Sequence, residues 1–194
     1  MGAWGPGLYS DDVTEDVRGI YVDKLHRGKN GEQASKEMIA EFEWACSDED
    51  DAPVFWFAMA DMQWNYGRLQ EEVKKKALYY LDDMKNLQRW EHENPKMAEK
   101  RKQVLNELRK KLNTLQPSEK KVSQYRLYHC QWKVGDMYAY QLEGEYAKER
   151  GLNGKYLLFY KIAESIWWPG HVIPVVYIKL TENNEIPKTR EELE

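Results

Sequence analysis

The spacing of apolar residues along the chain changes near residue 117. Before this point apolar side chains recur every three or four residues, as in Val13, Val17 and Tyr21, which is typical of amphipathic helices. After it, short runs of aromatic and β-branched residues alternate with glycine and proline, as strands alternate with turns. The pattern therefore predicts an α+β chain in which helices precede strands.

The first part of the chain is predicted to form a helical domain over residues 1–116. The segment 54–64 is apolar nearly all round and is expected to be the central buried helix. Leu87 and Trp90 are assigned to a short turn, and the glycine-rich arm 1–9 is expected to pack on the helices. The other helices are amphipathic and are expected over 13–27, 32–45, 71–83 and 95–115.

The last part is predicted to form a β-rich domain over residues 122–194, joined to the helices by a linker at 117–121. Gly135-Asp136 is expected to form a tight turn that joins the first two strands. Short connections between strands indicate a small antiparallel β-sheet or an SH3-like barrel. The expected strands cover 125–133, 137–142, 156–162 and 172–180.

Charge is distributed unevenly along the chain. The net charge of the 194 residues is −4, but residues 1–66 carry 5 Lys or Arg and 14 Asp or Glu. Residues 67–121 carry 15 basic and 9 acidic side chains. An acidic front followed by a basic region can steer charged partners. The alternative, a solvated surface whose charges neutralise one another, stays open.

The sequence contains no signal for a metal, a cofactor or a membrane. Its two cysteines, Cys46 and Cys130, have no CxxC spacing, which argues against a zinc site or a disulfide framework. Its first twelve residues lack the basic and apolar regions of a signal peptide. The longest apolar run, 52–62, is too short to span a bilayer. We therefore expect a cytoplasmic protein without a cofactor or a membrane interaction.

Two groups of residues are candidates for binding. Trp167 and Trp168 precede Pro169-Gly170 and form a rigid aromatic corner, which would either anchor a partner or close the end of a barrel. His171 follows in the same turn and would contact a ligand or pack. The acidic run after the second predicted helix is the other candidate. The predicted binding residues are Trp167, Trp168, His171, Asp48, Asp50 and Asp51.

Evidence for catalysis is weaker. Asp61 lies in the most apolar segment, where a shifted pKa would suit acid–base chemistry, although a partner at a helix end, in Trp4 or in the arm backbone would also explain it. His129 and Cys130 are adjacent, so a strand would place them on opposite faces, one in the core and one on the surface. No phosphate loop, zinc-protease motif or nucleophile elbow is present. A hydrolase built on Asp61 and His171 is the least supported hypothesis.

A nucleic-acid-associated protein is the alternative to a protein-binding function. Lys74–Lys76 and the seven basic residues of the segment 96–111 could follow a phosphate backbone. However, Glu99 and Glu107 interrupt that segment, and no aromatic residues alternate with the basic ones to stack on bases. Both hypotheses remain open at the level of sequence.

Two sequence resemblances bear on function. The opening MGAWGPGLYSDD and the later DDAPVFWFAMADMQWNYGRL resemble a bacterial family of unknown function whose members begin MGAWG. The segments WKVGDMYAYQL, GKYLLFYKI and IPVVYIKL resemble a β-rich family of immunity proteins of bacterial toxin systems. The second resemblance implies a non-enzymatic protein that occludes a toxin, although residues 143–152 are inserted after the second strand. The acidic first third would then suit a basic toxin such as a nuclease.

Overall fold

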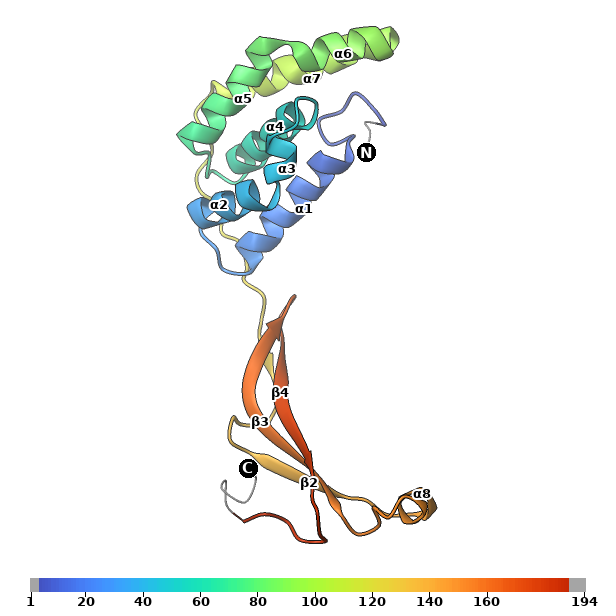
Figure 1. Ribbon diagram of the computed structural model, residues 1–194. Helices are drawn as coiled ribbons and strands as arrows, with labels where there is room; N and C mark the ends of the chain where they lie inside the picture. Colours follow the sequence, from blue (N-terminus) through green and yellow to red (C-terminus); the bar gives the residue numbers. More distant parts are fainter. Residues whose placement is uncertain (1–3, 189–194) are drawn as a thin grey trace. The chain divides into compact units, whose positions relative to one another are not determined.

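The computed structural model describes residues 4–188 and divides the chain into two units, residues 1–124 and 125–194. The first unit is helical and the second is built on a β-sheet (Figure 1). The chain is therefore α+β, with helices before strands, which confirms the predicted fold class.

The helical unit is arranged around one buried helix. Every residue of α4 from Ala52 to Gln63 is buried, including Phe55, Phe57 and Met59. This confirms that the all-round apolar segment forms the central helix. The helices of this unit are α1 (Asp12–His26), α2 (Gly31–Glu41), α3 (Glu43–Cys46), α4 (Asp51–Asn65), α5 (Glu71–Asp83), α6 (Lys85–Glu93) and α7 (Pro95–Leu112).

The prediction of a short turn around Leu87 and Trp90 is wrong, because these residues belong to the helix α6. Met84, in the left-handed conformation with φ of 58°, separates α6 from α5. Leu87 is buried, and the neighbouring Asn86 accepts a hydrogen bond from Arg101 Nε of α7 at 3.1 Å. The contact with α7 stabilises this short helix. One buried leucine is too little of a pattern for the sequence to predict the helix.

The N-terminal arm is held against the helices over its described residues 4–9. Leu8 and Tyr9 pack on the core, as expected for an ordered arm. The guanidinium of Arg101 donates to the carbonyl oxygens of Gly7 at 2.9 Å and Pro6 at 3.4 Å. This guanidinium is almost fully buried, and burial lowers its pKa to about 10.

The segment after α7 stays in contact with the helical unit. Lys120 N–H donates to the carbonyl oxygen of Tyr66 at 3.0 Å, and the Lys120 carbonyl accepts from Arg68 Nη2 at 3.2 Å. His26 Nδ1 lies 2.6 Å from the carbonyl oxygen of Ser123. The predicted linker, 117–121, thus contacts the first unit, and the division of the chain follows it at residue 124.

The β unit contains a four-stranded sheet in the order β1-β4-β3-β2. The pairs β2–β3 and β3–β4 are antiparallel, whereas β1 is parallel to β4, so the sheet is mixed. Figure 1 shows β3 and β4 as a long curved hairpin. The elements of this unit are β1 (Tyr128–His129), β2 (Met137–Gln141), α8 (Glu145–Glu149), β3 (Tyr156–Trp167) and β4 (His171–Leu180).

Three details of the sheet differ from the sequence prediction. The first predicted strand, 125–133, pairs only at Tyr128 and His129, and Gly135-Asp136 does not join two paired strands because β1 and β2 lie at opposite edges. β3 continues past the predicted end at Ile162 to Trp167. A register shift at Ile162 interrupts the alternation of side chains there, which hides the second half of the strand from a pattern of period two.

Candidate functional site

The predicted aromatic corner lies at the turn between β3 and β4. Trp167 is paired with His171 across this hairpin, and its side chain is 69% exposed. Trp168 is half-buried, with its ring centroid 5.9 Å from that of Tyr125. The two tryptophans therefore have different surroundings: Trp167 is available to a partner, whereas Trp168 packs within the unit.

A close backbone contact fixes the turn. Gly170 has φ of +142°, and a Cβ atom at this position would lie 2.4 Å from the carbonyl oxygen of Arg126. The Gly170 carbonyl in turn accepts a hydrogen bond from Tyr128 N–H at 2.8 Å. Only glycine fits this contact, which holds β1 beside the start of β4.

His171 lies among aromatic and cationic groups. Its ring centroid is 6.2 Å from that of Tyr128, with an angle of 30° between the rings. The guanidinium of Arg126 lies 5.8 Å from the Tyr128 ring centre. Both His171 and Tyr128 are exposed, so this stack extends the surface beside Trp167.

Strand register extends this surface along the hairpin. His171 and the alternate residues of β4 that follow it share one face, because side chains two positions apart in a strand point the same way. All of these side chains are exposed. We call this set the corner surface, and it consists of Tyr128, Trp167, His171, Ile173, Val175 and Tyr177.

The corner surface is suited to contact rather than to bond chemistry. Apart from His171 its side chains are aromatic or aliphatic, and they bring no carboxylate, thiol or ammonium group to the histidine. A contiguous exposed apolar surface of this kind is typical of an interaction site. Large aromatic side chains such as Trp167 and Tyr128 contribute most where such surfaces bind.

The predicted acidic residues have local roles at the start of α4. The Asp48 carboxylate accepts backbone hydrogen bonds from Asp51 at 3.0 Å and Asp50 at 2.8 Å, and these bonds lower the pKa of Asp48. Asp50 forms an ion pair with Arg89 at 3.3 Å. Partial burial raises the pKa of Asp51. Asp48 therefore serves to start a helix, and a binding role for the three aspartates stays a prediction.

Asp61 is buried and has three side-chain partners. Its carboxylate accepts from Lys111 Nζ at 2.6 Å, from Tyr9 Oη at 2.7 Å and from Asn65 Nδ2 at 2.8 Å. Burial and the nearby carboxylate raise the pKa of Tyr9 far above its usual value. The arm contributes Tyr9 Oη to Asp61, instead of the Trp4 indole or a backbone amide, and α7 contributes Lys111. Asp61 holds the arm, α4 and α7 together, and His171 belongs to the other unit.

The prediction that one of His129 and Cys130 lies in the core and the other on the surface is wrong, because both residues are exposed. They also approach the same pair of charges. His129 Nδ1 lies 3.6 Å from a Glu164 carboxylate oxygen, and Cys130 Sγ accepts from Lys161 Nζ at 3.4 Å. Cys130 follows the end of β1, so the alternation of a strand does not apply to it.

Lys161 is the centre of this cluster. Its side chain is fully buried, and its ammonium group contacts Glu164 at 2.6 Å and also donates to the Trp132 carbonyl. The bulge at Ile162 turns Lys161 and Glu164 to the same face of β3. The hydrogen bond between them raises the pKa of Lys161 and lowers that of Glu164.

These two shifts predict a pH dependence for the stability of the β unit. Because the folded pKa of Glu164 lies below its ordinary 4.5, its contribution is present above pH 4.5 and is lost as the pH falls through the folded value. Because the folded pKa of Lys161 lies above 10.5, its contribution is present below pH 10.5 and is lost as the pH rises through the folded value.

The double variant Lys161→Met/Glu164→Gln is expected to show a flatter profile of unfolding free energy against pH on both the acid and the alkaline side. Denaturant unfolding of the β unit, repeated across pH, measures the two profiles. Glu182→Gln, at an exposed site outside the cluster, serves as a control for removal of one carboxylate. Superimposable profiles for the wild type and the double variant would show that the ion pair does not couple to folding.

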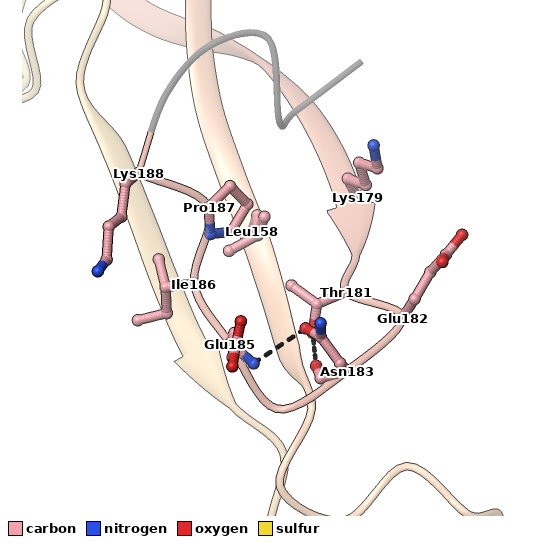
Figure 2. Close-up of a pocket in the computed structure, with 9 residues that line it drawn as sticks. All are labelled: Leu158, Lys179, Thr181, Glu182, Asn183, Glu185, Ile186, Pro187 and Lys188. Atoms are coloured by element: carbon pink, nitrogen blue, oxygen red, sulfur yellow. Dashed lines mark hydrogen bonds between the residues drawn. The ribbon is translucent and has the colours of Figure 1, made fainter.

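A cavity of about 550 Å³ lies where the segment after β4 passes over Leu158 (Figure 2). Two local hydrogen bonds shape this segment: Thr181 Oγ1 donates to the Asn183 carbonyl at 2.6 Å, and Glu185 N–H donates to Asn183 Oδ1 at 3.1 Å. The described lining contains no histidine or cysteine, and its charges are of both signs. The lining residues are Leu158, Lys179, Thr181, Glu182, Asn183, Glu185, Ile186, Pro187 and Lys188.

Two properties of the described residues 4–188 bear on other functions. No three His, Cys, Asp or Glu side chains within this range converge in an arrangement that would hold a metal ion. No helix in it combines the length and the apolar character that crossing a bilayer requires. No family model, curated protein or solved structure matches the chain.

Proposed function

We propose that this chain is a non-enzymatic binding protein whose β unit docks on another protein. The observation that carries the proposal is the corner surface, on which Trp167 is 69% exposed at the end of the β3–β4 hairpin. An exposed tryptophan held by a fixed turn loses little conformational freedom on binding, which favours its use as an anchor.

The most specific form of this proposal is an immunity protein that neutralises a bacterial toxin by occlusion. Support comes from the resemblance of WKVGDMYAYQL and the two following strand segments to such a family, and from the acidic residues 1–66, which suit a basic toxin. Occlusion requires a surface and no catalytic residues. Co-expression with the products of neighbouring genes tests this form, because a toxin partner should co-purify and lose its toxicity.

Trp167→Ala is expected to weaken partner binding by about 30-fold or more, which corresponds to a loss of at least ~2 kcal/mol for an anchor residue. The unfolding free energy should change little, because the side chain is mostly exposed. Isothermal titration of the co-purified partner measures the first effect and denaturant unfolding the second.

Trp4→Ala is the matched control, since Trp4 is also exposed but belongs to the helical unit. Partner binding should survive this substitution. Equal affinity of the Trp167→Ala variant and the wild type would remove the corner surface from the interface and contradict the proposal.

Nucleic-acid binding has less support in the structure than in the sequence. Of the basic residues in α7, Arg101 is buried against the arm, Arg109 pairs with Asp82, and Lys111 pairs with Asp61. These internal contacts reduce the charge that α7 can offer to phosphates. Retention of RNA or DNA that modest salt releases, with no protein partner, would favour this alternative over the corner surface.

A further inference from the structure

We propose that two copies of this chain associate by antiparallel pairing of their β2 strands. β2 is at one edge of the sheet, where β3 is its only partner among the described residues. Two backbone hydrogen bonds, one just before β2 and one just after it in the chain, show which residues of β2 face β3. Lys161 N–H donates to the Asp136 carbonyl, and Leu142 N–H donates to the Lys155 carbonyl. Because hydrogen-bonded pairs alternate along an antiparallel ladder, the backbone N–H and C=O groups of Tyr138 and Tyr140 bond to β3. The backbone groups of Met137, Ala139 and Gln141 point the other way, towards the open edge of the sheet.

The exposed edge of β2 lacks the features that usually prevent strand pairing. Its sequence, MYAYQ, contains no charged residue and no proline. Tyr138 is 51% exposed and Tyr140 is 64% exposed. An uncharged, aromatic edge of this kind is a template for another strand.

The edge is complementary to itself. When two β2 strands pair about a two-fold axis at Ala139, Ala139 faces Ala139, and Met137 faces Gln141 of the second copy, in hydrogen-bonded pairs. Tyr138 then lies opposite Tyr140 of the second copy in a non-hydrogen-bonded pair, where side chains are closest. No like charges meet, which is why a second copy fits this edge well.

The pairing also continues an apolar surface across the new sheet. The register places Tyr138, Phe159 and Ile178 in one row on a single face. A second row on that face joins Tyr140 to Leu157 and Leu180. The pairing of Tyr138 with Tyr140 of the second copy joins the rows of the two copies. The two four-stranded sheets then form one sheet of eight strands. Five-residue edges bury less than the ~1,200 Å² of a stable interface, so the dimer is expected to be weak and dependent on concentration.

Ala139→Pro is the discriminating variant. Proline removes the outward N–H of Ala139 while leaving the Tyr138 and Tyr140 bonds to β3, and proline is tolerated in edge strands. Ala139→Val keeps the N–H and is the matched control. Sedimentation equilibrium of the full chain should show the wild type and Ala139→Val rising from 23.1 kDa towards twice that mass with concentration. Ala139→Pro should remain at 23.1 kDa.

A second pair of variants tests the register without proline. Tyr138→Lys/Tyr140→Lys places lysines opposite each other in the dimer, and Tyr138→Glu/Tyr140→Glu does the same with carboxylates. Each should be monomeric alone, and an equimolar mixture should form a heterodimer. A wild type that stays monomeric to about 1 mM, or an Ala139→Pro variant that associates as the wild type does, would overturn the proposal. Both outcomes are independent of Trp167 and of a protein partner.

Discussion

Lys111→Met is expected to lower the unfolding free energy of the helical unit by about 2–4 kcal/mol. The substitution leaves the Asp61 carboxylate buried with two hydrogen bonds and no counter-charge. Lys111 also donates to Asn65 Oδ1 at 2.7 Å and lies 4.8 Å from the centre of the Trp64 ring. We expect a smaller loss of unfolding free energy than for a completely buried ion pair, because the Lys111 side chain is 25% exposed.

Chemical denaturation followed by the helical circular dichroism signal measures this loss. Lys110→Met, at the next and exposed position of α7, should change stability by no more than ~0.5 kcal/mol. Adding Asp61→Asn to Lys111→Met removes the unpaired charge, so the double variant should be more stable than the single one. If Lys111→Met behaved like Lys110→Met, the ion pair would contribute nothing to the fold.

The helical unit shows which parts of a fold local sequence can predict. α4 was predictable because its residues are apolar on every side, and α1 because Asp11 precedes it and Gly28 follows it. α6 was not predictable, because what holds it is the contact of Asn86 with Arg101, 15 residues away. Local pattern is sufficient where a helix is specified by its own residues and fails where a neighbour specifies it.

The sheet depends more on contacts between distant residues. The parallel pairing of β1 with β4 joins Tyr128 to His171, and no local turn records it. The bulge at Ile162 breaks the alternation that would have extended β3. Trp167 was recognisable as a candidate from its Trp-Trp-Pro-Gly context, but its exposure followed only from the packing of the hairpin. The edge position of β2 likewise follows from the strand order.

The interaction partners of the charged residues were the least predictable part of the structure. Asp61 and Lys111 are 50 positions apart, and Lys161 and Cys130 are 31 positions apart. A sequence shows that a buried carboxylate needs a partner, but many lysines could supply it. Only the packing of α4 against α7 selects Lys111.

Gly67→Ala is expected to destabilise the helical unit by about 2–4 kcal/mol. Gly67 ends α4 with φ of +67°, a conformation that costs an L-residue energy. A Cβ atom there would lie 2.4 Å from the carbonyl oxygen of Pro117 and 2.6 Å from that of Ser118. Because both obstacles are backbone, the segment after α7 must move away and give up the bond between Lys120 N–H and the Tyr66 carbonyl.

Gly19→Ala provides a control of opposite sign. Gly19 lies inside α1, and a Cβ atom there would meet nothing within 4 Å, so alanine should stabilise the unit by about 0.5–1 kcal/mol. Denaturant unfolding compares the two variants, and hydrogen exchange at the Lys120 amide reports directly on the segment. Protection of that amide should fall in Gly67→Ala and persist in Gly19→Ala. Unchanged protection in both would show that residues 117–124 do not need Gly67 to stay attached, and the stability loss would then arise from the strain at residue 67 alone.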